Sequence, residues 1–346
     1  MHIKKLILFI ASAFLLASCS DTIKESVHRK VIDFRVVTTR GIETRIENFE
    51  KFESTALLPD GNNFYNGIEF IRTGVYYNSY EAYYWPSFST MLRFYAWSPS
   101  AEELPGTIAI NGDNQLLKDF TPSTDISSQI DFISAATSGS EETSAAGVEL
   151  NFQHNLAQLE VKATCRHEGY VLKVSGISFN NFIGQATFDF ESSEWELSEN
   201  KITYLVEYDT ARTLGDATIN LMKEDGNNAL IIPQTLIQWN PGEDRTNTEK
   251  GAFIGIKIQI STKAGTRIFP LYGNYDWMAI PINGKLEAGY RYIYTIDFTA
   301  GSGFVSPDKT PPTEGSHDCF GPGDEIYGQQ ILISPDVSAW SIPTDI

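Results

Sequence analysis

The stretch AFIGIKIQIST, residues 252–262, decides the fold class of this chain. Isoleucine stands at every second position from Ile254 to Ile260, with glycine, lysine or glutamine between. Successive side chains of a β-strand point to opposite faces, so this alternation is typical of a strand with one buried face.

The same period of two recurs along most of the chain. In YRYIYTIDFT (290–299), aromatic or aliphatic residues occupy every second position from Tyr290 to Phe298, and three of the four residues between them are polar. Further strand-like runs are VIDFRVVTT (31–39), MLRFYAW (91–97), GVELNFQ (147–153), QLEVKATC (158–165), YVLKVSGISF (170–179), KITYLVEY (201–208) and ALIIPQTL (229–236). Turn signals such as Asp60-Gly61 and Asn283-Gly284 separate these runs. We therefore predict an all-β fold of antiparallel sandwiches.

The length of 346 residues is enough for two domains. We place the boundary near residue 165, where a strand-like run gives way to the turn-prone RHEGY (166–170). This gives an N-terminal domain over 19–165 and a C-terminal domain over 166–346. Residues 301–325 are rich in proline, glycine and charge, which is the composition of a linker.

Charge and motifs exclude several classes of function. The formal net charge is -18, so the chain would repel nucleic acid. The five histidines are scattered without metal-ligand spacing, and no nucleophile elbow or phosphate loop is present. Paired carboxylates of a glycosidase could come from distant strands, but no pair stands out among the acidic residues. We expect no enzyme, no metal and no cofactor.

The first eighteen residues have the layout of an export signal. Lys4 and Lys5 precede an apolar run that is shorter than the roughly 20 residues needed to span a bilayer. The run ends in Leu16-Ala17-Ser18-Cys19, which resembles a bacterial lipoprotein signal. On that reading Cys19 is lipidated and becomes the mature N-terminus, tethered to the outer membrane.

The other two cysteines are Cys165 and Cys319. In an oxidising compartment they could pair, and they could equally remain free because they are far apart in sequence.

The aromatic stretch YYNSYEAYYWP, residues 76–86, has two readings. Tyr76, Tyr80, Tyr84 and Trp85 could form a platform that stacks on sugar rings, or they could be strand and core residues. The structural reading is the better supported one.

Taken together, the sequence resembles the fimbrillin family, the exported lipoprotein subunits of fimbriae in Bacteroidales. The resemblance rests on the lipoprotein signal and on Tyr84-Trp85-Pro86, LRFYAWSP (92–99), DFISAAT (131–137), VELNFQHNLAQLEVKA (148–163), IIPQTL (231–236), GYRYIYTIDFTAGSG (289–303) and Val337-Ser338-Ala339-Trp340. These signals are individually loose, but they run in order through nearly the whole mature chain. The resemblance implies two tandem transthyretin-like β-sandwich domains.

The resemblance also implies a mode of assembly. In polymerising members an arginine-specific protease removes the first strand, and a C-terminal strand of a neighbouring subunit fills the groove. Here VIDFRVV (31–37) would be removed after Arg45 or Arg40, of which Arg45 leaves more room beyond the strand. These arginines could also belong to an ordinary turn.

The donated strand would lie in GQQILISPDVSAW (328–340). Its donated side chains would be Ile331, Ile333, Val337 and Trp340, with Pro335 interrupting the ladder. Alternatively, this segment returns to its own sheet.

The sequence thus predicts a structural subunit of cell-surface fimbriae that supports adhesion and binds other subunits by strand addition. The alternative is a monomeric surface lipoprotein that binds glycan or host protein.

Overall fold

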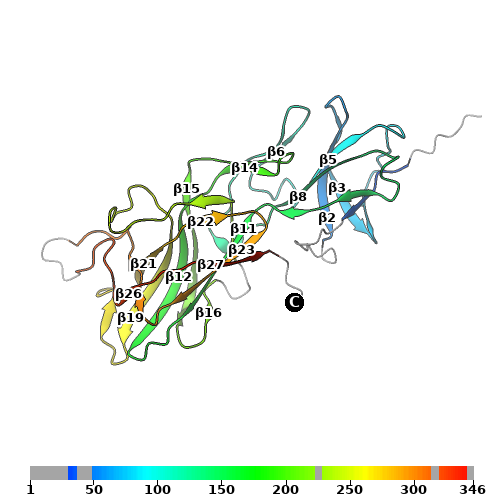
Figure 1. Cartoon of the computed structure of the whole chain (residues 1–346). Helices are drawn as coiled ribbons and strands as arrows, with labels where there is room; N and C mark the ends of the chain where they lie inside the picture. The colour runs from blue at the N-terminus through cyan, green and yellow to red at the C-terminus, as the bar shows by residue number, and fades with distance from the viewer. Residues whose placement is uncertain (1–29, 37–48, 223–227, 313–318, 341–346) are drawn as a thin grey trace, which may run out of the picture.

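The computed structural model describes residues 30–36, 49–222, 228–312 and 319–340. This part of the chain is built from β-strands, with a short 3-10 turn, η2 (Ile126–Ser128). The predicted all-β fold is confirmed. Figure 1 shows two lobes, with the blue and cyan strands on the right and most green to orange strands on the left.

The N-terminal lobe is an eight-stranded sheet in the order β10-β8-β5-β2-β3-β4-β1-β9. Its strands are β1 (Phe34–Val36), β2 (Lys51–Leu57), β3 (Asn63–Thr73), β4 (Tyr76–Ser79), β5 (Leu92–Ser98), β8 (Ile133–Gly139), β9 (Val148–Leu150) and β10 (Gln153–His154). The two end strands, β9 and β10, are separated in sequence by only Asn151 and Phe152. The sheet therefore curls back on itself and encloses an aromatic core that includes Phe34, Phe52 and Phe94.

The C-terminal lobe is a sandwich of two larger sheets. One sheet has the order β16-β11-β23-β27, with β17 also paired to β11; the other has the order β15-β12-β19-β21-β25, with β20 also paired to β19. The strands of the first are β11 (Ala157–Thr164), β16 (Ile219–Asn220), β17 (Ala229–Ile231), β23 (Tyr290–Asp297) and β27 (Pro335–Ala339). Those of the second are β12 (Tyr170–Ile183), β15 (Lys201–Thr213), β19 (Phe253–Thr262), β20 (Arg267–Phe269), β21 (Asp276–Pro281) and β25 (Phe304–Val305). Two short pairs complete the lobe: β18 (Gln234–Leu236) with β22 (Gly284–Leu286), and β24 (Gly301–Ser302) with β26 (Gln329–Gln330).

The period-two isoleucines of β19 carry the core of this sandwich. Ile254, Ile256, Ile258 and Ile260 are all fully buried, in one hydrophobic cluster with Leu159 of the facing sheet. The alternation read from the sequence thus corresponds to the inner face of a sheet.

A separate four-stranded sheet joins the two lobes. It has the order β14-β13-β7-β6 and consists of β6 (Thr107–Ile110), β7 (Gln115–Phe120), β13 (Ala186–Asp189) and β14 (Glu194–Leu197). In its centre Phe188 pairs with Leu117 from the other half of the chain. The cluster beneath it holds Trp97 of the N-terminal lobe together with Ile232 and Trp340 of the C-terminal lobe. The lobes therefore share a hydrophobic core.

Strand pairing changes from one lobe to the other between β10 and β11. Strand β11 pairs with β16, β17 and β23, all of the C-terminal lobe. Residues 157–164, which we assigned to the N-terminal domain, thus pair with strands of the C-terminal sheets.

The start of the predicted linker, residues 301–307, is buried. Gly301 and Ser302 pair with β26, and Val305 is fully buried in the main core. A Cβ atom at Gly301 would lie 1.7 Å from the main-chain oxygen of Gln329. Glycine at this position allows a close approach of two backbones rather than flexibility.

Candidate functional site

The first described segment, residues 30–36, is inserted between β4 and the strand β9. Phe34 pairs with Tyr77 of β4 in antiparallel fashion and with Val148 of β9 in parallel fashion. The Ile32 N–H donates a hydrogen bond to the Tyr83 carbonyl at 2.7 Å. The segment therefore has strand neighbours on both sides.

Every second side chain of this segment enters the aromatic core. Ile32 and Phe34 are fully buried, and Val36 is 7% exposed. The ring of Phe34 lies edge to face against three phenylalanine rings, with centroid distances of 5.6 Å to Phe52, 4.7 Å to Phe70 and 5.3 Å to Phe94. Without residues 30–36 the lobe would expose the facing edges of β4 and β9 and a row of apolar pockets.

The C-terminal strand β27 lies at the edge of its sheet, where it pairs antiparallel with β23. Its side chains are exposed or half-buried, and Val337 is 53% exposed. Two buried residues, which we call its anchors, flank the strand in sequence. Ile331 packs in the main core and is 9% exposed, and Trp340 packs in the core between the lobes and is 7% exposed. Backbone pairing and these two anchors hold the strand, since its own side chains bury little surface.

The predicted donor residues thus lie in different surroundings. Ile331 and Trp340 are buried, Ile333 is partly buried against the main core, and Val337 faces solvent. The segment has returned to its own sheet, which is one of the two alternatives that the sequence left open.

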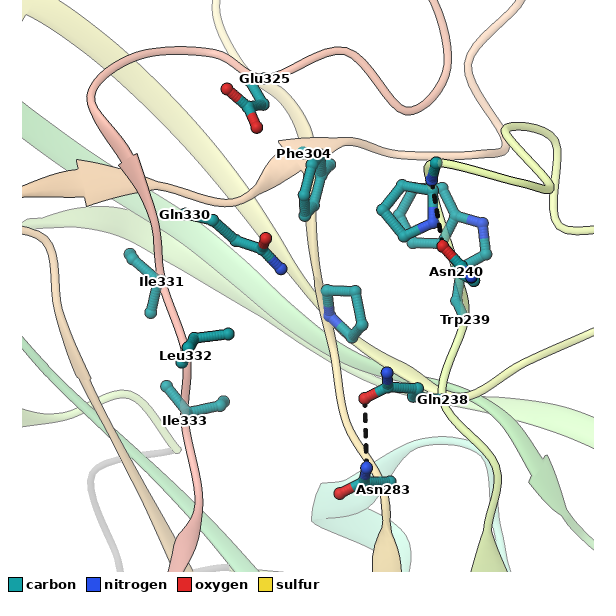
Figure 2. Close-up of a pocket in the computed structure, with 13 residues that line it drawn as sticks. Gln238, Trp239, Asn240, Asn283, Phe304, Glu325, Gln330, Ile331, Leu332 and Ile333 are labelled. Carbon is teal, nitrogen blue, oxygen red and sulfur yellow. Dashed lines mark hydrogen bonds between the residues drawn. The ribbon is translucent and has the colours of Figure 1, made fainter.

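A cavity of about 530 Å³ lies beside the segment that precedes β27. Figure 2 shows Ile331, Leu332 and Ile333 along one side of it and Gln238 and Asn283 on the other. The Asn283 amide donates to Gln238 Oε1 at 3.2 Å. Leu332 is 85% exposed, so this apolar side chain has little packing in the described chain.

The aromatic stretch around Tyr80 is divided between core and surface. Trp85 is 1% exposed and packs edge to face on Phe94 with centroids 5.8 Å apart, so its ring cannot stack on a ligand. Tyr80 is fully exposed, and Tyr84 is 48% exposed. Tyr76 is half-buried.

The structure places two cysteines, Cys165 and Cys319, and both are free thiols. Cys165 is buried, its S–H points to the Phe298 carbonyl at 3.8 Å, and burial raises the pKa of the thiol. Cys319 is exposed. Cys19, Arg40 and Arg45 lie outside the described residues.

No cluster of three or more histidine, cysteine or carboxylate side chains in the described ranges could hold a metal ion. No helix formed by the described part of the chain is long and apolar enough to cross a membrane.

The architecture and the inserted first strand define a class of all-β proteins. In this class a short N-terminal strand completes the core of one lobe, and a C-terminal strand forms the edge of a sheet in the other lobe. The sequence profile of the fimbrillin-like family matches residues 35–313. The chain belongs to this fimbrillin-like family, whose members are structural, non-enzymatic proteins.

Solved structures share the fold. A fimbrial protein from Bacteroides vulgatus ATCC 8482 matches with a TM-score of 0.61 at 13% identity, covering 90% of this chain and 99% of the other. A protein from Parabacteroides distasonis ATCC 8503, named as a candidate cell adhesion protein, matches with a TM-score of 0.53 at 10% identity, covering 92% and 98%. No protein with a curated description matches the sequence.

Sequence reasoning missed His154, whose ring stacks on that of Trp340, and Asp131, whose carboxylate lies 2.6 Å from His154 Nδ1. His154 ends the alternating series that begins at Val148, and this alternation could have predicted that its side chain is buried.

Proposed function

We propose that this protein is a structural subunit of cell-surface fimbriae that supports adhesion and joins other subunits by strand addition. Membership of the fimbrillin-like family supports the surface location and the association with other fimbrial subunits. In this proposal Cys19 carries the lipid anchor at the outer membrane, and cleavage after Arg45, or after Arg40, detaches the first strand.

The observation that carries the proposal is the double pairing of residues 30–36 together with their buried side chains. A segment that pairs on both sides leaves unpaired N–H and C=O groups on two strands when it departs. An incoming strand would satisfy those groups and refill the pockets of Ile32, Phe34 and Val36. Since groove and donor are different surfaces, the contact repeats head to tail and makes a filament.

Strand geometry selects among the donor residues. Ile331, Ile333 and Val337 share one parity, so in a regular strand they point to one face and could fill successive pockets. Trp340 has the opposite parity and would lie on the other face unless a bulge intervenes. Because β27 is an edge strand with exposed side chains, its departure exposes little apolar surface of the strand itself, and the buried residues Ile331 and Trp340 account for most of the retention.

The test is the intact mass and N-terminal sequence of the protein isolated from its native surface, compared with the Arg40→Ala, Arg45→Ala double variant. We expect an N-terminus at Ile46 or Gly41 and fibres in the unmutated protein, and neither in the double variant. A lipidated Cys19 at the N-terminus of both proteins, without fibres, would refute maturation by cleavage.

A second candidate function is ligand binding by a monomer. It is favoured by the exposure of Tyr80 and Tyr84, which are free to stack on a sugar ring. Saturable glycan binding that is lost in Tyr80→Ala or Tyr84→Ala, by a chain that stays monomeric after proteolysis, would support this candidate instead.

A further inference from the structure

The anchor residue Trp340 stacks on a buried histidine of the other lobe. The rings of Trp340 and His154 have centroids 4.0 Å apart and an interplanar angle of 19°. His154 is 3% exposed, and its Nδ1 lies 2.6 Å from Oδ2 of Asp131. The carboxylate orients the imidazole, and the imidazole supports the indole.

Hydrogen bonds hold this histidine only from one side. Within the described residues, His154 Nε2 is buried without a hydrogen-bond partner. A buried unpaired polar atom is unfavourable, and water would satisfy it if Trp340 moved away. The free energy that is lost when Trp340 leaves the stack is therefore partly offset by the hydration of His154 Nε2.

The histidine belongs to a segment that also pairs with the first strand. Residues 148–150 pair with β1, and residues 153–154 pair with β8. The inward side chains of this segment are Val148, Leu150, Phe152 and His154, all 3% exposed or less. Residues 148–154 thus pair with the first strand at one end and contact Trp340 through His154 at the other.

Aromatic packing links the same two ends. Phe152 lies 5.3 Å from Phe52, and Phe52 lies 5.6 Å from Phe34 of the first strand, measured between ring centroids. Strand β9 is an end strand of the sheet, and β1 is its neighbour there. Loss of the first strand would remove both the pairing of β9 and one side of the packing around Phe52.

We propose that the stack of Trp340 on His154 is an intramolecular clasp that holds the C-terminal strand in its own molecule until the first strand is removed. The proposal rests on the proposed strand exchange and adds its regulation. A single event would then open the acceptor groove and loosen the donor strand. Intact subunits would keep both strands and remain unassembled.

The experiment is hydrogen–deuterium exchange, read by mass spectrometry on peptides covering residues 335–340. The full chain is compared before and after treatment with an arginine-specific protease, at a concentration that keeps it monomeric. We expect exchange in these peptides to become faster by about tenfold after cleavage, which corresponds to the loss of one well-packed aromatic pair. Peptides of β19 serve as the internal control and should not change.

Variants test the clasp without cleavage. His154→Ala should accelerate exchange at residues 335–340 by a similar factor in the uncleaved chain, and His154→Phe, which keeps a ring under Trp340, should not. Phe34→Ala, which loosens the first strand directly, should also accelerate it. Val337→Ala, a change on the exposed side of β27, is the matched control.

The outcomes separate the two proposals. Unchanged exchange at residues 335–340 in the cleaved chain and in His154→Ala would overturn the clasp, whether or not fibres form. Accelerated exchange in both, without fibres at high concentration, would support the clasp and count against strand exchange.

Discussion

Replacing Phe34 by alanine tests whether side-chain packing, rather than backbone pairing alone, holds the first strand in its lobe. Phe34 is fully buried, and its ring contacts three other phenylalanine rings edge to face. Truncation of a buried phenylalanine typically costs about 3–5 kcal/mol, which includes the cavity that is left. The aromatic surroundings place Phe34→Ala at about 4 kcal/mol, in the middle of that range.

The assay is urea-induced unfolding of the uncleaved chain, followed by tryptophan fluorescence, to which the six tryptophans of the chain contribute together. Trp85 is buried in the same aromatic core as Phe34, and its share of the signal reports on this lobe. Phe88→Ala is the matched control, because Phe88 is 62% exposed and its loss should change the free energy of unfolding by less than about 0.5 kcal/mol. A loss below about 1 kcal/mol in Phe34→Ala would refute the reasoning, since the strand would then be held mainly by its backbone.

Three further changes have defined outcomes. Tyr77→Phe removes the hydroxyl that donates to the Phe49 carbonyl at 2.6 Å and should cost about 1–3 kcal/mol in the free energy of unfolding at pH 7. Burial raises the pKa of Tyr77, so the free energy that its neutral phenol contributes to folding is present below about pH 10 and is lost as the pH rises further. Between about pH 9 and 11, the unfolding midpoint of Tyr77→Phe should therefore fall less than that of the unmutated protein. Of the thiols at Cys165 and Cys319, only Cys319 should react with a thiol reagent in the native chain, and rapid labelling of both would contradict the burial of Cys165. Gly301→Ala should cost about 1–3 kcal/mol because its Cβ would clash with a facing main-chain oxygen, as a thermal shift would measure.

Local alternation in the sequence was sufficient to predict the fold class. Ile254 to Ile260 line the inner face of β19, and Tyr292 and Tyr294 line that of β23, as period two requires. Tyr290, at the start of the same series, is 39% exposed because it lies near the end of the strand, where the core stops.

Features that depend on distant pairing could not be predicted in this way. The pairing of Phe188 with Leu117 is set by how two lobes meet, and neither strand carries a signal for its partner. Gly301 belongs to a segment with the composition of a linker, and its sequence does not show that the backbone of Gln329 approaches it. Trp340 looked like part of a donated face, yet it is buried on a histidine that no spacing rule singles out.

In the proposed fibre, the C-terminal segment of one subunit enters the groove of another. The most direct measurement uses a photo-crosslinking amino acid at position 333, in fibres grown from an equal mixture of ordinary and ¹⁵N-labelled protein. We expect crosslinks between differently labelled chains, from position 333 to β4 or β9. Crosslinks confined to single chains, to the main core that Ile333 contacts in the isolated subunit, would contradict it.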